Sequence, residues 1–154
     1  MRRAVRRVFG GRGDRLAAIA LIIGMASGCA IRLVSNYDEQ IDKGATDLQK
    51  EVDTFLTDLE TKAGTPEASY DMAKAFYPRY LVDLRALQVR AHAQPKNELT
   101  EKQLDLMMDS VEQLRRQHQA GPLAKAVIDV NRNLFSQAWG AIVKLELAKK
   151  RGER

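Results

Sequence analysis

The chain has few of the residues from which catalytic and metal sites are usually built. Its 154 residues include one cysteine, Cys29, and two histidines, His92 and His118. A single thiol forms neither an intrachain disulfide nor a cysteine metal cluster. The sequence also lacks haem-attachment, phosphate-loop, nucleophile-elbow and His-Glu-x-x-His motifs, and the paired Glu-x-x-His of di-iron bundles. We therefore predict no catalytic residue, no metal site, no cofactor and no enzymatic activity.

Sustained alternation of apolar and polar residues, which marks a β-strand, is missing as well. Apolar residues instead recur three and four positions apart, as on one face of a helix. In the first such segment they are Ile41, Ala45, Leu48, Val52, Phe55 and Leu59. Breaks at 64–66, 94–97 and 120–122 separate four segments of this kind. The sequence predicts an all-α fold, in which residues 37–150 form an antiparallel up-down-up-down four-helix bundle behind a signal-peptide helix.

The ends of these helices carry recognisable signals. The helices are expected over residues 38–63, 65–93, 100–119 and 122–150. Gly64 suits the position after the first helix, and Thr65-Pro66 suits the start of the second. Pro78 predicts a kink in the second helix, or a break that restarts at Arg79. Thr100-Glu-Lys-Gln103 predicts a capping box for the third helix.

The fourth predicted helix has two adjoining apolar stripes, so we expect it to pack against two neighbours. One stripe is Val127, Leu134, Ala141 and Leu145, and the other is Ile128, Phe135, Trp139 and Ile142. Residues 37–64 carry eight acids and three bases, while residues 122–154 carry three acids and seven bases. This complementary charge predicts that the first and last helices are neighbours. His92 and His118 would lie at opposite ends of the bundle, each as a helix-end cation or a solvated side chain.

One long uncharged run stands near the N-terminus. It comprises the 16 residues 16–31, and six arginines and one acid precede it. A basic segment, a short apolar segment and small residues before a cleavage site make up a secretory leader. Because a bilayer-spanning helix needs about 20 apolar residues, we expect cleavage rather than a permanent span. An uncleaved anchor or an ordinary soluble-export signal is the alternative.

The run ends in Ala26-Ser27-Gly28-Cys29, which resembles the lipobox of bacterial lipoproteins. The resemblance implies that signal peptidase II recognises Ala26, Ser27 and Gly28, and removes residues 1–28. It also implies that Cys29 is lipidated with chains such as palmitate, on its thiol and on its new amino group. Each buried methylene contributes about 0.8 kcal/mol to membrane binding. Residues 29–36 would then be the lipidated cysteine and a short tether.

Two further resemblances imply a location. Residues 37–56 are similar to the segment after the lipobox in small helical periplasmic lipoproteins of proteobacteria. The residue after Cys29 is Ala30 and not Asp, and the absence of Asp there resembles a sorting signal for the outer membrane. Together they imply a lipid-anchored protein of the cell envelope, on the periplasmic face and at the outer membrane, with the inner membrane left open. The export route is also open, because Arg6-Arg7-Val8-Phe9 partly matches the twin-arginine signature.

The formal net charge of +5 raises the question of nucleic-acid binding. All of this excess lies in the leader. Without residues 1–28 the chain keeps 19 basic and 19 acidic residues, so it has no electrostatic footprint for phosphate backbones. We predict no nucleic-acid partner.

Two groups of side chains are candidate contact sites. If the first helix leaves the membrane, the fourth returns to it and brings basic residues to the lipid headgroups. These are Lys149, Lys150, Arg151 and Arg154. Residues 151–154, at the end of the chain, are predicted to be a basic tail. A cationic last turn that complements the helix dipole is the alternative. At the opposite end, the candidate partner-binding residues are Tyr70, Phe76, Tyr77 and Tyr80, for which burial in the core is the alternative.

These features favour a non-catalytic lipoprotein that acts through contacts with another periplasmic protein. Two alternatives stay open. Leu99-Thr-Glu-Lys-Gln103 resembles the Leu-Thr-x-x-Gln motif of small helical periplasmic chaperones, which implies a chaperone or a sensor of envelope stress. A four-helix bundle can also hold a ligand or cofactor, for example a haem bound by Met107 or Met108 with a histidine.

Overall fold

The computed structural model describes residues 34–153. The predicted signal peptide, Cys29, most of the tether and Arg154 lie outside the described residues. Residues 34–153 contain helices and no strand, which confirms the all-α class predicted from the sequence. In this part of the chain, no helix combines the length and the apolar character that a membrane span requires.

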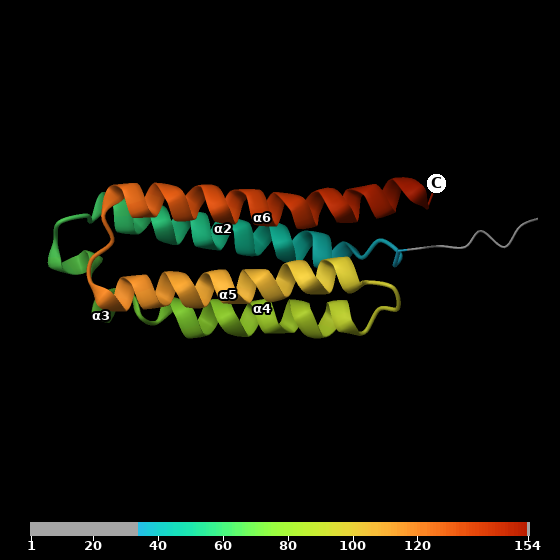
Figure 1. Cartoon of the computed structure of the whole chain (residues 1–154), viewed down its shortest axis with the longest axis horizontal. Helices are drawn as coiled ribbons and strands as arrows, with labels where there is room; N and C mark the ends of the chain where they lie inside the picture. The colour runs from blue at the N-terminus through green and yellow to red at the C-terminus, as the bar shows by residue number, and fades with distance from the viewer. Residues whose placement is uncertain (1–33, 154) are drawn as a thin grey trace, which may run out of the picture. The chain divides into compact units, whose positions relative to one another are not determined.

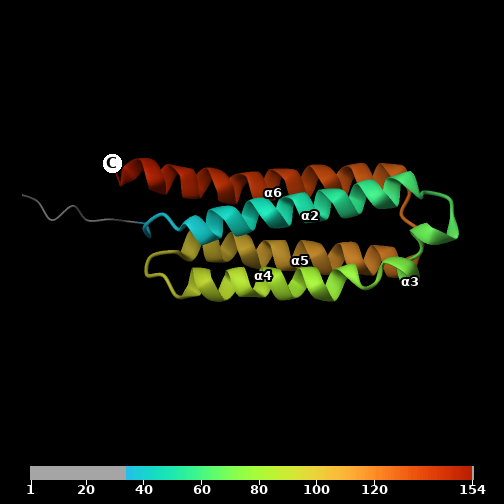
Figure 2. The same cartoon turned by 180° about the vertical axis from the view of Figure 1, so that it is seen from behind.

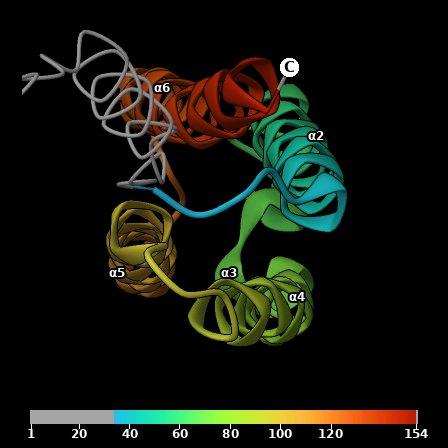
Figure 3. The same ribbon diagram turned by 90° about the vertical axis from the view of Figure 1, so that its right-hand side faces the viewer.

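Four long helices pack side by side. They are α2 (Glu39–Thr61), α4 (Phe76–His92), α5 (Glu98–Ala120) and α6 (Lys125–Gly152). A 3-10 turn, η1 (Pro66–Ala68), and the short helix α3 (Tyr70–Ala73) lie between α2 and α4. α2 contacts α4 and α6, and α5 contacts the same two helices (Figure 1, Figure 2). The view along the helices in Figure 3 shows the four of them arranged around one interior.

α2 forms where the sequence supplies both a cap and an apolar seam. The Asp38 carboxylate accepts hydrogen bonds from the backbone N–H groups of Gln40 (2.8 Å) and Ile41 (3.2 Å), which makes Asp38 the N-cap. The buried seam is Ile41, Ala45, Leu48, Val52, Leu56 and Leu59. After the helix, Gly64 has a φ of 82°, a left-handed conformation that favours glycine. The predicted position of this helix and its stop signal are confirmed.

The segment predicted as one helix over residues 65–93 is divided into three pieces. Pro66 opens only η1, α3 follows, and α4 begins at Phe76. Pro78 is therefore in the first turn of α4, where backbone N–H groups have no partner within the helix. Proline costs no hydrogen bond there. The expected restart at Arg79 is wrong, because the break precedes Pro78 instead of following it.

The predicted capping box of the third helix is also wrong. α5 begins at Glu98 with Asn97 at its N-cap position, and no side chain caps its first turn. Thr100 lies inside the helix and is fully buried. Its hydroxyl donates a hydrogen bond to Oε1 of Glu146 on α6 (3.2 Å). Thr100 thus belongs to the contact between two helices and not to the start of one.

α6 contacts two helices, α2 and α5, as its double stripe predicts. The stripe that is buried consists of Ile128, Phe135, Trp139 and Ile142. The second stripe is incompletely covered, since Leu134 is 42% exposed and Ala141 is also exposed. α6 packs more closely along α2 than along α5. One apolar strip of α6 is therefore left at the surface.

The acidic first helix and the basic last helix are neighbours, as their charges predict. Arg132 pairs with Glu60 (2.9 Å) and with Asp53 (3.2 Å), and Lys125 also pairs with Glu60. Hydrogen bonds from Lys125 and Arg132 lower the pKa of Glu60. Exposed ion pairs of this kind add little to the free energy of unfolding. Their main effect is to favour α6 over the other helices as the neighbour of α2.

Candidate functional site

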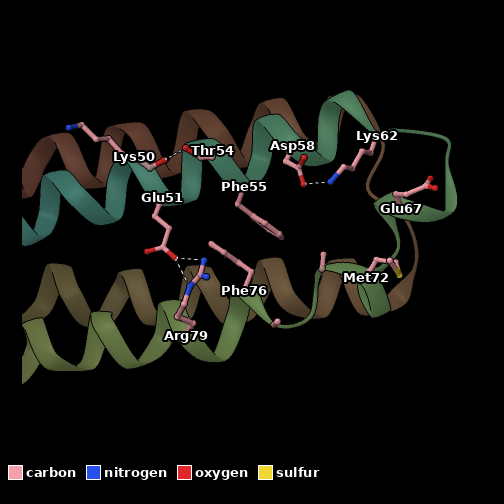
Figure 4. A pocket seen from close by; sticks show the side chains of 12 residues that line it. Lys50, Glu51, Thr54, Phe55, Asp58, Lys62, Glu67, Met72, Phe76 and Arg79 are labelled. Atoms are coloured by element: carbon pink, nitrogen blue, oxygen red, sulfur yellow. Dashed lines mark hydrogen bonds and ion pairs between the residues drawn. The ribbon is translucent and has the colours of Figure 1, made fainter.

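An open groove of about 690 Å³ lies between α2, α3 and the start of α4 (Figure 4). Its apolar lining comes from Phe55, Met72, Ala73, Ala75 and Phe76. Its polar rim comes from Lys50, Glu51, Thr54, Asp58, Lys62, Glu67 and Arg79. A concave apolar surface with a few polar groups around it is the usual form of a binding site.

Two phenylalanines form the back of the groove. The rings of Phe55 and Phe76 stack with their centroids 3.8 Å apart and their planes within 3°. Figure 4 shows the two side chains reaching toward each other from α2 and α4. Phe55 also meets the edge of Tyr77 at 5.5 Å. Since each ring is held by another, the apolar wall is preformed.

The rim of the groove is charged but balanced. Arg79 donates hydrogen bonds from two nitrogens to Oε1 of Glu51, at 2.9 and 3.1 Å. Lys62 pairs with Asp58 at 2.6 Å. Met72 stands beside these pairs with 68% of its surface exposed. The groove is therefore suited to an apolar side chain with a polar surround, and not to a strongly charged ligand.

A buried histidine supports the groove from behind. His118 is fully buried, its Nδ1 lies 2.8 Å from the Tyr77 hydroxyl, and its Nε2 lies 2.9 Å from the Ala68 carbonyl oxygen. A carbonyl oxygen only accepts, so Nε2 carries a proton and donates it to the Ala68 carbonyl. Burial raises the pKa of Tyr77, which keeps that hydroxyl protonated. The expectation that His118 is a solvated side chain is therefore wrong, because the side chain is fully buried.

The four aromatic residues predicted to bind a partner do not share one surface. Tyr77 and Tyr80 are fully buried, and the Tyr80 hydroxyl donates to the Leu48 carbonyl (3.1 Å) and accepts from Trp139 (3.0 Å). Phe76 is 7% exposed and contributes to the groove. Tyr70 is half-buried and stacks on Tyr77 at 5.8 Å. The prediction is corrected for Tyr77 and Tyr80, which belong to the core.

A second polar cluster lies at the other end of the helices. Lys149 is 6% exposed, and its Nζ donates to Glu146 (2.6 Å), Asn97 (2.7 Å) and Thr100 (3.0 Å). Glu146 is fully buried and also accepts a hydrogen bond from the backbone N–H of Asp38 (3.2 Å). Lys149 therefore has no free charge for lipid headgroups. This corrects its assignment as a membrane-proximal basic residue.

The chain before α2 is fixed to this cluster. Ser35 donates its backbone N–H to the Lys96 carbonyl (2.8 Å) and its hydroxyl to Oδ1 of Asn97 (2.8 Å). Asp38 pairs with Arg90 at 2.8 Å. Burial opposes the ionisation of Asp38, but hydrogen bonds from Arg90 and two backbone N–H groups outweigh it and lower the pKa. Residues from Ser35 onward are thus part of the folded body, which corrects the predicted tether of residues 29–36 at Ser35 and Asn36.

Two of the other predicted basic residues, Lys150 and Arg151, follow Lys149 at this end. The Lys150 ammonium lies 4.6 Å from the centre of the Tyr37 ring, and Arg151 is exposed. A hydrogen bond to Asp42 raises the pKa of Tyr37 to about 12. The Tyr37 backbone N–H donates to Oε1 of Glu153 (2.7 Å).

Metal-binding geometry is not found in residues 34–153, where no three side chains of His, Cys, Asp and Glu converge. His92 is exposed and pairs with Glu101 at 2.9 Å. Met107 is fully buried among apolar residues of the core, and Met108 packs against that core.

The sequence did contain a signal for the buried ion pair. The inner stripe of α6 continues at the same spacing from Ile142 to Glu146 and Lys149. A charged residue that continues a buried stripe needs a buried partner. His118 carried a comparable signal, because it continues the buried seam of α5 four residues after Leu114.

Comparison of the chain with protein-family models, with curated proteins and with solved structures finds no match.

Proposed function

We propose that this protein is a lipid-anchored lipoprotein of the cell envelope, which holds a non-catalytic helical domain on the periplasmic side and acts by binding another protein. The anchor would be Cys29, within the sequence Ala26-Ser27-Gly28-Cys29 that resembles a lipobox. We also propose the outer membrane as its location. The domain would be an up-down-up-down antiparallel four-helix bundle.

Hydrogen bonds between helix ends support this topology. Tyr77 at the start of α4 bonds to His118 near the end of α5. Glu60 near the end of α2 pairs with Lys125 at the start of α6. An experimental structure in which consecutive long helices run in the same direction would contradict the proposal.

The observation that carries the functional proposal is the separation of tether and groove. The chain enters the domain at Ser35, beside Lys96 and Asn97 in the loop between α4 and α5. The groove, whose back wall is formed by Phe55 and Phe76, lies toward the other end of α2. A protein anchored through residues before Ser35 would therefore present the groove away from the membrane.

The groove favours one kind of partner. Its stacked phenylalanines and exposed Met72 would accept an aliphatic or aromatic side chain of the partner. Its paired rim charges would hydrogen-bond to the partner's backbone around that side chain. The partner we propose is a segment of a periplasmic protein that carries such an apolar anchor residue.

Photocrosslinking in the intact envelope tests this partner. A photoreactive side chain at Met72, which is 68% exposed in the groove, should give one discrete protein adduct. The same probe at Val89, which is 71% exposed on α4 and outside the groove, should not. Phe55→Ala should remove the Met72 adduct. Identical adducts from both positions would contradict the proposal.

Mass spectrometry and fractionation test the anchor. Protein from the native envelope should begin at Cys29 and carry the mass of its acyl chains. Cys29→Ser should release the domain from the membrane fraction. An unmodified Cys29 thiol, or an intact leader, would contradict the lipoprotein assignment while leaving the groove to be tested separately.

A second candidate function is storage or transport of a small apolar ligand. The volume of the groove, about 690 Å³, favours it, because drug-sized ligands occupy pockets of roughly 300–1,000 Å³. Native mass spectrometry of protein purified from the envelope would reveal a bound molecule, which Phe55→Ala should release.

A further inference from the structure

A second surface, uncharged and partly apolar, follows the seam between α5 and α6, away from the groove. On α5, six residues spaced four and three positions apart share one face. They are Leu99, Gln103, Leu106, Ser110, Gln113 and Gln117. This face differs from the buried seam of α5, because Leu99 and Leu106 are 59% and 57% exposed.

α6 contributes a matching stripe on the adjoining side. It consists of Val127, Val130, Leu134, Ala141, Leu145 and Ala148. Val130 is 66% exposed and Leu134 is 42% exposed. Residues of both stripes line a shared hollow of about 330 Å³. We refer to the two stripes together as the α5–α6 face.

α5 and α6 contact each other near both ends of the face. Near one end, the Asn131 amide donates a hydrogen bond to Gln117 (3.1 Å). Near the other end, Thr100 donates to Glu146 (3.2 Å). Since residue number rises along α5 as it falls along α6, the two helices run in opposite directions.

The α5–α6 face has no charged residue in either stripe, although charged residues make up 29% of the chain. The outer side of α4 differs, because Asp83 and Arg85 lie among its exposed valines Val82 and Val89. A surface that meets a copy of itself across a two-fold axis must not place like charges opposite each other. The α5–α6 face satisfies this condition.

We propose that the α5–α6 face joins two copies of this chain in a two-fold symmetric dimer. With the axis along the helices, α5 of one copy packs against α6 of its partner, again in opposite directions. These four helices then form a second bundle, in which the outer stripes face each other and Leu99, Leu106, Val130 and Leu134 are its exposed apolar residues that become covered. The same axis brings both chains into their domains at one end, so both tethers reach the same membrane.

The size of the face fits a dimer of moderate strength. From residue 99 to residue 117 it extends about 27 Å at 1.5 Å per residue. Two helices roughly 10 Å apart give it a width of about 20 Å. Each copy would bury on the order of 550 Å², or about 1,100 Å² in total, close to the lower limit for specific interfaces. We therefore expect a dissociation constant of about 1 to 10 μM.

Sedimentation velocity of the full chain in density-matched detergent tests the dimer at up to about 100 μM protein. A reductant keeps Cys29 from linking two copies. The unprocessed chain should sediment as a species with twice the 17.3 kDa mass of one chain. Leu106→Glu should raise the dissociation constant at least about tenfold, because the interface would bury an unpaired carboxylate from each copy. Val82→Glu is the matched control, since Val82 is 60% exposed on α4, and it should leave the dimer unchanged.

Leu106→Ala is the second variant, and it should weaken the dimer in the same direction without adding a charge. Circular dichroism of each variant establishes that the helices still form. A wild-type chain that is monomeric over the whole range would overturn the proposal. Equal dimerisation of Leu106→Glu and Val82→Glu would also overturn it, as would a complex in which a different protein covers the face.

Discussion

His118 and Asp38 are single residues that each hold several segments together. The His118 ring connects Tyr77 at the start of α4 to the Ala68 carbonyl in η1, while its own backbone belongs to α5. The Asp38 carboxylate caps α2 and pairs with Arg90 on α4. At this scale stability depends on whether buried polar groups keep their hydrogen-bond partners.

We expect His118→Leu to destabilise the protein by about 2 to 4 kcal/mol, because the buried Tyr77 hydroxyl and Ala68 carbonyl would both lose a partner. Urea unfolding at neutral pH measures this change. His92→Leu is the matched control, since His92 is exposed on the surface, and it should change stability little. Equal effects of the two substitutions would show that the buried hydrogen bonds of His118 do not matter.

We expect Asp38 to make part of the stability dependent on pH. Its pKa is lowered from an ordinary value of 3.8, so the folded state binds this proton less readily than the unfolded chain. Its contribution is thus fully present above about pH 4 to 5 and is lost as the pH falls through the lowered pKa. Asp38→Asn should be less stable than wild type at pH 6.

Thermal melting between about pH 6 and pH 2.5 measures this dependence. The two proteins should converge as the acid titrates. A difference that stays constant over the whole range would mean that the ionised form of Asp38 is not what stabilises the fold.

The helices are held by different devices at their ends and in their middles. Gly64 follows α2 with a φ of 82°, a conformation that costs L-residues about 1 kcal/mol or more. Gly140 lies in the middle of α6, where a Cβ would meet no atom within 4 Å. The same residue type is therefore required in one place and unfavourable in the other.

We expect Gly64→Ala and Gly140→Ala to have opposite effects. Gly64→Ala should destabilise by about 1 kcal/mol, because alanine is strained in the left-handed region. Gly140→Ala should stabilise by about 0.5 to 1 kcal/mol, because alanine is the better helix former and the space is free. Chemical denaturation of the two variants measures both changes in the free energy of unfolding. Changes of the same sign would contradict the helix limits described above.

At the scale of the whole domain, the cluster around Glu146 and Lys149 joins three distant segments. Lys149 on α6 bonds to Asn97 and Thr100 at the start of α5, and Glu146 accepts from Asp38 at the start of α2. Buried charges cost desolvation energy, so such a pair is stabilising only while both members are present. The cluster fixes where the chain enters the domain.

We expect Lys149→Met to destabilise the domain by about 3 to 5 kcal/mol, because Glu146 would be buried without its counter-charge. The double variant Glu146→Gln with Lys149→Met should recover a large part of that loss, since no unpaired charge is left. Lys150→Met, at an exposed neighbouring position, is the control and should have little effect. Denaturation curves of wild type, Glu146→Gln, Lys149→Met and the double variant form a cycle, and strict additivity of the two buried changes would contradict the coupling.

Most of the all-helical architecture could be predicted, and the candidate site could be predicted only in part. The spacing of Ile41, Ala45 and Leu48 gave α2, and the Gly64 stop was confirmed, because both depend on local backbone geometry. Phe76 was identified among four aromatic residues. Phe55, its stacking partner in the groove, was expected in the core seam, and only the packing of α4 against α2 leaves it half-exposed.

The sequence by itself determined three of the four long helices, the breaks at 64–66, 94–97 and 120–122, and the pairing of an acidic helix with a basic one. The reason is that propensity, periodicity and charge can be read within one segment of the chain. Only the tertiary structure decided which partners His118, Thr100 and Lys149 have, and that the outer stripe of α6 is left exposed. The environment of a polar side chain depends on which atoms other segments bring within hydrogen-bond distance. No local pattern carries that information, since all of these partners except Glu146 beside Lys149 lie 41 to 52 positions away along the chain.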